Sequence, residues 1–166
     1  MANIGVIFGS STGNTETAAE KIAEALGGAD VKNIADISED DINEYDCVVF
    51  GASTWGAGEL QDDWEDNIGT LDDADLSGKK VAIFGLGDQE GYPDTFVDAM
   101  GTIAEKVKSG GATIVGQTST DGYTFDESTA VVDGKFLGLV LDEENQADES
   151  DDRIAKWCEQ LKKEFA

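Results

Sequence analysis

Short apolar runs alternate with amphipathic repeats along the chain. The apolar runs lie at residues 4–8, 46–52, 81–84 and 112–115, with a shorter mixed segment at 30–34. Between them, apolar residues recur every three or four positions, as on one face of a helix. The clearest sets are Ala18, Ala19, Ile22, Ala23 and Leu26, then Phe96, Met100, Ile103 and Val107, and finally Ile154, Trp157, Cys158, Leu161 and Phe165. This alternation predicts an α/β fold whose helices cover both faces of a parallel sheet.

Two of the predicted strands are unusual. Residues 46–52 are apolar at both alternating sets of positions, which indicates a strand covered on both faces. The fifth strand begins at 112–115, is interrupted by the polar stretch 117–135 and resumes at 136–141. No repeat or linker divides the chain, so residues 1–166 are predicted to form one domain.

Glycine and proline mark the expected ends of the helices. Gly27-Gly28 and Gly110-Gly111 are placed to end two of them. Pro93 suits the first turn of the helix that carries Phe96. In a doubly wound sheet, ligands lie beyond the carboxyl ends of the strands, near the point where strand order reverses. The loops after the first, third and fourth strands are therefore expected to converge.

The loop after the first strand has the composition of a phosphate site. Residues 9–15 read Gly-Ser-Ser-Thr-Gly-Asn-Thr and lead directly into a helical pattern. Unpaired N–H groups at a helix start bind anions, hydroxyls add donors, and Gly13 permits close approach of the backbone. The loop has neither the Gly-Lys-Ser/Thr of a triphosphate loop nor Gly-x-Gly-x-x-Gly. Without Lys or Arg, it suggests a permanently held monophosphate; the alternative is a loop that is merely polar.

The other two loops each carry one large aromatic residue. Trp55 lies in the predicted loop 53–60 and Tyr92 in the predicted loop 85–92. Two aromatic side chains beside a phosphate site can hold a planar ring between them, although each could instead pack on its own scaffold. Pro93 restricts Tyr92 to extended backbone angles, which would fix the direction of its side chain.

Charge separates this sequence from an average globular protein. Its 166 residues include 36 Asp and Glu, 11 Lys and Arg and no His, for a formal net charge of −25. Between residues 33 and 78 there are fourteen acidic residues and no basic one. This balance disfavours nucleic acid and anionic membranes as partners and favours a basic protein. The alternative is a generally acidic surface that serves solubility or a salty environment.

Several kinds of chemistry have no support in the sequence. Cys47 and Cys158 each lie within an apolar pattern and are expected to be core residues. With no His and no Cys cluster, the chain offers no transition-metal site and no catalytic constellation, so we expect a protein that is not an enzyme. No apolar run is long enough to cross a bilayer, and no signal-peptide pattern precedes residue 4; a cytoplasmic location is expected.

Motifs along nearly the whole chain resemble those of the flavodoxins. They are the phosphate-loop sequence of residues 10–15, Thr54-Trp55, Gly58-Glu59-Leu60, Gly85-Leu-Gly-Asp-Gln89, Gly91-Tyr92, Ser119-Thr-Asp-Gly-Tyr123 and Gly134-Lys-Phe136. The interruption at 117–135 is similar to the extra loop of the long-chain members. The resemblance implies a five-stranded parallel sheet in order 2-1-3-4-5. It also implies a monomer with noncovalently bound flavin mononucleotide (FMN), which carries single electrons at low potential between redox proteins.

The resemblance also implies roles for individual residues. Trp55 and Tyr92 would flank the isoalloxazine ring, and Thr54 and Glu144 would approach the ribityl chain. The phosphate would be held by Ser10, Ser11, Thr12, Gly13, Asn14 and Thr15. The remaining cofactor contacts would come from Gly56, Ala57 and Gly58 after the tryptophan, and from backbone groups around Gly87, Asp88, Thr95 and Val97 at the pyrimidine edge.

Gly56 departs from the family pattern, since long-chain members frequently carry a bulkier residue there. In this family the peptide after the tryptophan turns its carbonyl toward flavin N5 on one-electron reduction. Glycine makes that turn cheap, so we expect Gly56–Ala57 to stabilise the neutral semiquinone. Abundant carboxylates would disfavour the anionic hydroquinone and lower the semiquinone/hydroquinone potential.

The family implies basic redox partners: a ferredoxin/flavodoxin–NADP reductase, a pyruvate oxidoreductase or a nitrogenase reductase. The main alternative is an FMN-dependent NAD(P)H:quinone reductase of the same fold, which would want basic residues for the nicotinamide nucleotide. A phosphorelay receiver would need an acidic cluster where this chain has Gly9-Ser10-Ser11. A nonredox acidic module would leave the two loop aromatics unexplained.

Overall fold

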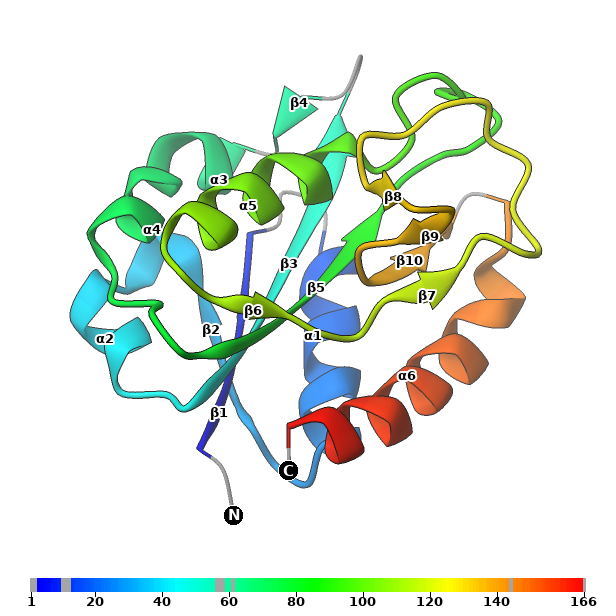
Figure 1. Ribbon diagram of the computed structural model, residues 1–166. Coiled ribbons are helices and arrows are strands. Elements are labelled where there is room, and N and C mark those ends of the chain that lie inside the picture. Colours follow the sequence, from blue (N-terminus) through cyan, green and yellow to red (C-terminus); the bar gives the residue numbers. More distant parts are fainter. Residues whose placement is uncertain (1–2, 10–12, 56–58, 61, 144, 166) are drawn as a thin grey trace.

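The computed structural model describes residues 3–9, 13–55, 59–60, 62–143 and 145–165, and shows helices on both faces of a twisted sheet (Figure 1). The helices are α1 (Asn14–Ala25), α2 (Glu39–Asn43), α3 (Asp62–Asn67), α4 (Gly69–Asp73), α5 (Asp98–Ser109) and α6 (Ser150–Glu164). The main strands are β1 (Ile4–Phe8), β2 (Asp30–Asn33), β3 (Cys47–Trp55), β5 (Lys80–Leu86) and β10 (Leu139–Leu141).

The main sheet has the predicted order. Its strands run β10-β5-β3-β1-β2, all parallel, which is 2-1-3-4-5 when β5 and β10 are counted as the fourth and fifth strands. The fifth position is filled in two pieces. β6 (Thr113–Ile114) pairs with Lys80 and Val81 at the start of β5, and β10 pairs with its end. The expected interruption of the fifth strand is therefore confirmed, but the strand resumes at Leu139, because Phe136 belongs to another sheet.

Side chains that alternate along β3 separate the two halves of the core. Val48 and Phe50 face a cluster that includes residues of α2, α3, α4 and α5, such as Trp64 and Met100. Cys47 and Val49 face the other cluster, which holds the apolar stripes of α1 and α6. This two-sided burial is what the apolar run at 46–52 predicted. Cys47 and Cys158 are both buried and free, as expected.

The interruption at 117–135 forms a structure of its own. β7 (Thr118–Ser119), β9 (Lys135–Phe136) and β8 (Val131–Val132) make a small antiparallel sheet in that order. Asp133 and Gly134 join β8 to β9 with positive φ angles of 55° and 80°, the pattern of a type I′ hairpin. In Figure 1 this small sheet lies beside β5 and β10, at the edge of the main sheet that β10 forms.

The prediction of a simple loop at residues 53–60 was wrong: β3 extends to Trp55, and β4 (Glu59–Leu60) pairs back on it in antiparallel register. The acidic segment after Ser38 forms α2, which the hydrophobic pattern did not predict and whose start is a capping box made by Ser38 and Asp41. The last helix, in contrast, buries all five residues of its predicted stripe.

Candidate functional site at the carboxyl edge of the sheet

The loops after β1, β3 and β5 leave the same edge of the sheet. Because β1, β3, β5 and β10 are parallel neighbours, their carboxyl ends lie together. Backbone bonds continue the pairing beyond the strands: Gly9 N donates to Gly51 O at 3.2 Å, and Gly87 N donates to Leu141 O at 3.1 Å. We call the connecting segments the β1 loop (residues 9–15), the β3 hairpin (residues 53–60) and the β5 loop (residues 87–97).

Within the β1 loop, a left-handed residue precedes the first residue of α1. Gly13 has φ 89° and ψ −12°, and its carbonyl accepts bonds from both Thr17 N and Thr17 Oγ1 at 3.0 Å. A methyl group added to Gly13 would meet no atom of the described residues within 4 Å, so this space is open. Asn14 is exposed, and Thr15 is only 1% exposed. The first N–H groups of a twelve-residue helix thus open at this edge.

Part of the predicted site lies outside the described residues. These are Ser10, Ser11 and Thr12 of the β1 loop, Gly56, Ala57 and Gly58 of the β3 hairpin, and Glu144. The backbone of Thr54 and Trp55 is described: they end β3 and pair with Leu60 and Glu59. The β3 hairpin is therefore anchored in the sheet on both sides of its connection.

The Asp88 side chain shapes the β5 loop itself. Its Oδ1 accepts bonds from Glu90 N at 3.1 Å, Gly91 N at 2.8 Å and Asn145 Nδ2 at 2.8 Å. The Gly91 amide, followed by the Asn145 amide, lowers the pKa of the Asp88 carboxyl, because these donors favour its charged form. Asp88 O also accepts a bond from Tyr92 N at 2.9 Å. The loop is thus closed into a turn around Asp88.

Tyr92 follows this turn and is 48% exposed, a high value for a large aromatic side chain. Pro93 does not start the next helix, as the sequence suggested, because α5 begins at Asp98. Its carbonyl instead accepts bonds from Asp126 N at 2.8 Å and Glu127 N at 2.9 Å. The interruption at 117–135, which we call the insertion, therefore holds the backbone next to Tyr92.

The end of the β5 loop is strained. Val97 has φ 48°, a conformation that is rare for a β-branched residue, and its side chain is completely buried. A methyl group added to Gly87 would lie 3.0 Å from Val97 Cγ1, so the two ends of the loop are in close contact. Thr95 comes before Val97 in the loop. Its N–H donates to Tyr92 O at 3.4 Å, and its carbonyl accepts a bond from Asp98 N at 3.2 Å. The structure thus brings Gly87, Asp88, Tyr92, Thr95 and Val97 together.

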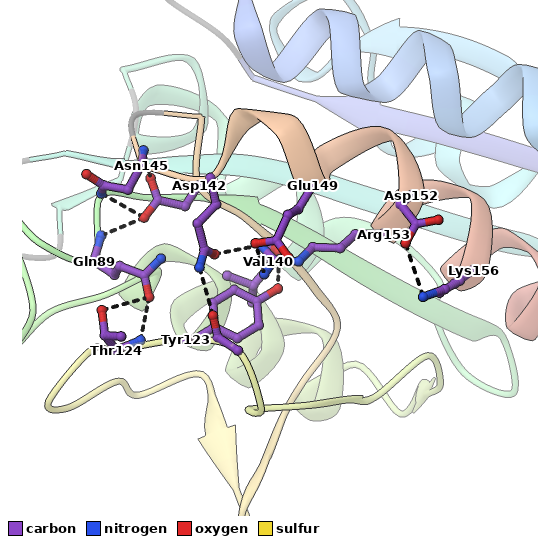
Figure 2. A network of polar contacts seen from close by, with 12 residues as sticks. Gln89, Tyr123, Thr124, Val140, Asp142, Asn145, Glu149, Asp152, Arg153 and Lys156 are labelled. Carbon is purple, nitrogen blue, oxygen red and sulfur yellow. Dashed lines mark hydrogen bonds and ion pairs between the residues drawn. The ribbon is translucent and has the colours of Figure 1, made fainter.

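The sequence analysis assigned no role to three residues that hold this loop, namely Gln89, Asp142 and Asn145 (Figure 2). Asp142 is fully buried directly after β10. Gln89 is 2% exposed, and its Oε1 accepts bonds from Thr124 N at 2.5 Å and Thr124 Oγ1 at 3.3 Å. One signal was available: an Asp at the carboxyl end of a strand, with Asn three positions later, is typical of a side-chain-stabilised turn.

Tyr123 connects the insertion to β10 and α6. Its hydroxyl donates to Val140 O at 2.6 Å, and the Arg153 guanidinium lies 4.2 Å from the centre of its ring. Burial raises the pKa of Tyr123 to about 12, although the nearby Arg153 acts in the opposite direction. The Tyr123 hydroxyl, Val140 and Arg153 are shown in Figure 2. Beside them, Gln146 Nε2 donates to Gly122 O at 2.7 Å.

The comparisons with known proteins agree with this geometry. A model of the flavodoxin family matches residues 6–157. Flavodoxin from Helicobacter pylori is 49% identical over 166 residues and covers both chains completely. Flavodoxin from Trichodesmium erythraeum is 52% identical over 169 residues, covering 99% of each chain. The chain belongs to the flavodoxin family.

Solved flavodoxin structures share its architecture. Fusobacterium nucleatum flavodoxin bound to flavin mononucleotide superposes with a TM-score of 0.94 at 32% identity and full coverage of both chains. Oxidised flavodoxin 2 from Bacillus cereus gives 0.73 at 26% identity, with 99% and 100% covered. Flavodoxins are electron-transfer proteins and not enzymes.

Within the described residues, no group of three His, Cys, Asp or Glu side chains is arranged to hold a metal ion. None of the helices in the described part of the chain combines the length and apolar character needed to cross a bilayer.

Proposed function

We propose that this chain is a low-potential one-electron carrier that holds one FMN molecule noncovalently at the carboxyl edge of its sheet. The observation that carries the proposal is the convergence of a helix N-terminus, the end of β3 and the β5 loop at that edge. The family relationship and the FMN bound to Fusobacterium nucleatum flavodoxin support the choice of cofactor.

The β1 loop fits a phosphate monoester. The left-handed Gly13 and the start of α1 supply backbone donors, and a methyl group added to Gly13 would meet no described atom within 4 Å. Residues 9–17 contain no Lys or Arg, so backbone and hydroxyl donors would hold the charge. The phosphate ligands are Ser10, Ser11, Thr12, Gly13, Asn14 and Thr15.

The β3 hairpin and the β5 loop fit the ring system. Trp55 and Tyr92 flank the isoalloxazine, and the exposure of Tyr92 gives it the outer side. Thr54 lies along the ribityl chain. The backbone around Gly56, Ala57 and Gly58 would meet the reactive edge of the ring, and that around Gly87, Asp88, Thr95 and Val97 would meet the pyrimidine edge.

The cofactor supplies the redox chemistry, and the protein sets its energy and access. Trp55 and Tyr92 would exclude water from the ring faces when the flavin is bound. The acidic composition disfavours added negative charge at the ring, which lowers the potential of the second electron. The glycine at position 56 lets the adjacent peptide reorient at low cost.

The partners are redox proteins, and we assign them a basic docking surface. The fourteen acidic residues between positions 33 and 78 would steer such partners with a rate that falls as salt rises. Candidates are a ferredoxin/flavodoxin–NADP reductase, a pyruvate oxidoreductase or a nitrogenase reductase, each meeting a monomer of this chain. The cytoplasmic location expected from the sequence stays a prediction.

The test is stepwise anaerobic reduction of the flavin-loaded protein, followed by visible absorption. A one-electron carrier passes through a long-lived half-reduced flavin with its own long-wavelength band. Direct bleaching in a single two-electron step by NADPH would support the quinone reductase alternative, which none of the relatives described above favours. A protein that takes up no FMN would contradict both functions.

A further inference from the structure

Asp142 joins two loops at the edge of the sheet where we place the flavin. Its side chain is fully buried, and its two carboxylate oxygens serve different segments. Oδ1 accepts a bond from Asn145 N at 3.0 Å and closes the turn after β10. Oδ2 accepts bonds from Gln89 N at 3.1 Å and Asn145 Nδ2 at 2.9 Å (Figure 2).

The bond to Gln89 continues the strand pairing where the strands themselves have ended. Leu141 pairs with Leu86, and Gly87 N still reaches Leu141 O. Two residues further, Gln89 N has moved past the end of β10 and donates to the Asp142 side chain instead. The carboxylate therefore fixes the direction in which the β5 loop leaves the sheet.

Asn145 transmits this constraint to the turn around Asp88. The same Nδ2 atom donates to Asp142 Oδ2 and to Asp88 Oδ1, at 2.9 and 2.8 Å. Asp88 Oδ1 in turn holds the N–H groups of Glu90 and Gly91. The two carboxylates thus share one side-chain amide donor, and they also accept bonds from four backbone N–H groups, those of Gln89, Glu90, Gly91 and Asn145.

We propose that Asp142 is the positioning residue of the β5 loop and holds it in its flavin-binding shape before the flavin arrives. The proposal rests on the function proposed above, because that function assigns the β5 loop to the pyrimidine edge of FMN. Asp142 acts through Gln89, Asn145 and Asp88, all on the ring side of the proposed site. Pre-formed loops bind ligands more tightly because less conformational freedom is lost on binding.

The first test uses the apoprotein and does not depend on flavin. Amide hydrogen exchange is measured at Gln89, Glu90 and Gly91 in the unsubstituted chain and in Asp142→Ala. We expect these three amides to exchange about tenfold faster or more in the variant, since a buried bond to a charged acceptor is lost. Asp142→Asn keeps an oxygen that can accept from Gln89 N, and should restore part of the protection.

A matched control loses a comparable bond far from the site. Tyr45→Phe removes the 3.0 Å bond from Tyr45 Oη to Asp30 Oδ2, near the start of β2. It should leave exchange at Gln89, Glu90 and Gly91 unchanged. Equal exchange of these amides in the unsubstituted chain and Asp142→Ala would overturn the proposal, whether or not the chain binds FMN.

The second test compares FMN with riboflavin, which lacks the phosphate. Asp142→Ala should weaken both ligands by the same factor, about tenfold, because it disturbs only the ring side of the site. A loss confined to FMN, or faster amide exchange with both affinities unchanged, would overturn the positioning role. A chain that binds neither ligand contradicts the proposed function. The exchange experiment, which needs no flavin, still tests whether Asp142 holds the β5 loop.

Discussion

The β1 loop and the β5 loop meet at the same edge but hold their shapes in different ways. Gly13 and α1 take their geometry from adjacent residues, with Thr17 bonding back to Gly13 O. The β5 loop depends on residues far along the chain, since Asp142 is 53 positions from Gln89 and Thr124 is 35. Local geometry can be read from a motif, whereas long-range geometry requires the folded sheet.

The largest effect is expected where β10 meets β5. A methyl group at Gly138 would lie 1.7 Å from Ile83 O, a backbone atom that cannot move away. Gly138→Ala should therefore lower the free energy of unfolding by about 3 kcal/mol or more. Urea denaturation of the apoprotein measures this. Gly69→Ala is the control, because its added methyl group meets no described atom within 4 Å; equal stability of the two variants would contradict the account.

The next effect concerns the contact between the β5 loop and the insertion. Gln89→Leu removes the Oε1 acceptor and leaves Thr124 N without this bond. The free energy of unfolding should fall by about 1–3 kcal/mol, and riboflavin should bind more weakly. Gln89→Glu retains an acceptor and should recover part of the loss. Unchanged riboflavin affinity in Gln89→Leu would show that the insertion does not stabilise the part of the site that binds the isoalloxazine ring.

A smaller effect is expected in the β1 loop. Gly13→Ala places a side chain at φ 89° in open space, so only backbone strain acts, worth about 1–2 kcal/mol. FMN affinity should fall and riboflavin affinity should change little, as measured by fluorescence titration. The same Gly69→Ala variant is the control, since it lies in a helix at ordinary φ. Equal weakening of FMN and riboflavin would argue against a phosphate site at Gly13.

The stability of the protein at alkaline pH tests the contribution of Tyr123, which joins the insertion to β10. The pKa of this buried phenol is raised from 10.0 to about 12, so above pH 10 the unfolded chain loses the proton first. The stability contributed by Tyr123 is complete below pH 10 and is lost as pH rises toward 12. Tyr123→Phe should cost about 1 kcal/mol at neutral pH through the bond to Val140 O and should show a shallower alkaline decline. Identical slopes from pH 9 to 12 would refute this assignment.

The smallest effect tests whether α1 needs a distant contact. Lys21 Nζ forms an ion pair with Asp151 Oδ1 at 2.7 Å, with the side chains 48% and 79% exposed. Because solvent screens such a pair, Lys21→Gln should change the free energy of unfolding by about 0.5 kcal/mol or less, as measured by urea denaturation. A loss of FMN affinity in this variant would show that the β1 loop also depends on long-range contacts.

The parallel α/β architecture and the convergence of the loops could be predicted because both follow from periodicity and connection rules, whereas the strand order 2-1-3-4-5 was an expectation from the resemblance to flavodoxins. The strands read as apolar runs, the helices as stripes, and parallel strands place their carboxyl ends together. Two missed elements also had local signals: Ser38 with Asp41 is a capping pattern, and Asp133-Gly134 is a hairpin turn. These were errors of interpretation and not limits of the sequence.

The β5 loop could not be predicted in the same way. The left-handed Val97 contradicts the intrinsic preference of a β-branched residue, so only the surrounding fold explains it. Pro93 suggested a helix start, but its carbonyl binds residues of the insertion. Asp142 is buried because β10 pairs with β5, which lies far earlier in the sequence. A pattern of neighbouring residues cannot predict such a pairing.

The central claim is that the two loops form two halves of one FMN site. The most direct measurement is a parallel titration of the apoprotein with FMN and with riboflavin, followed by flavin fluorescence. The account predicts that both ligands bind, FMN far more tightly because only it occupies the β1 loop. Equal affinities would show that the β1 loop holds no phosphate, and absence of binding would contradict the site altogether.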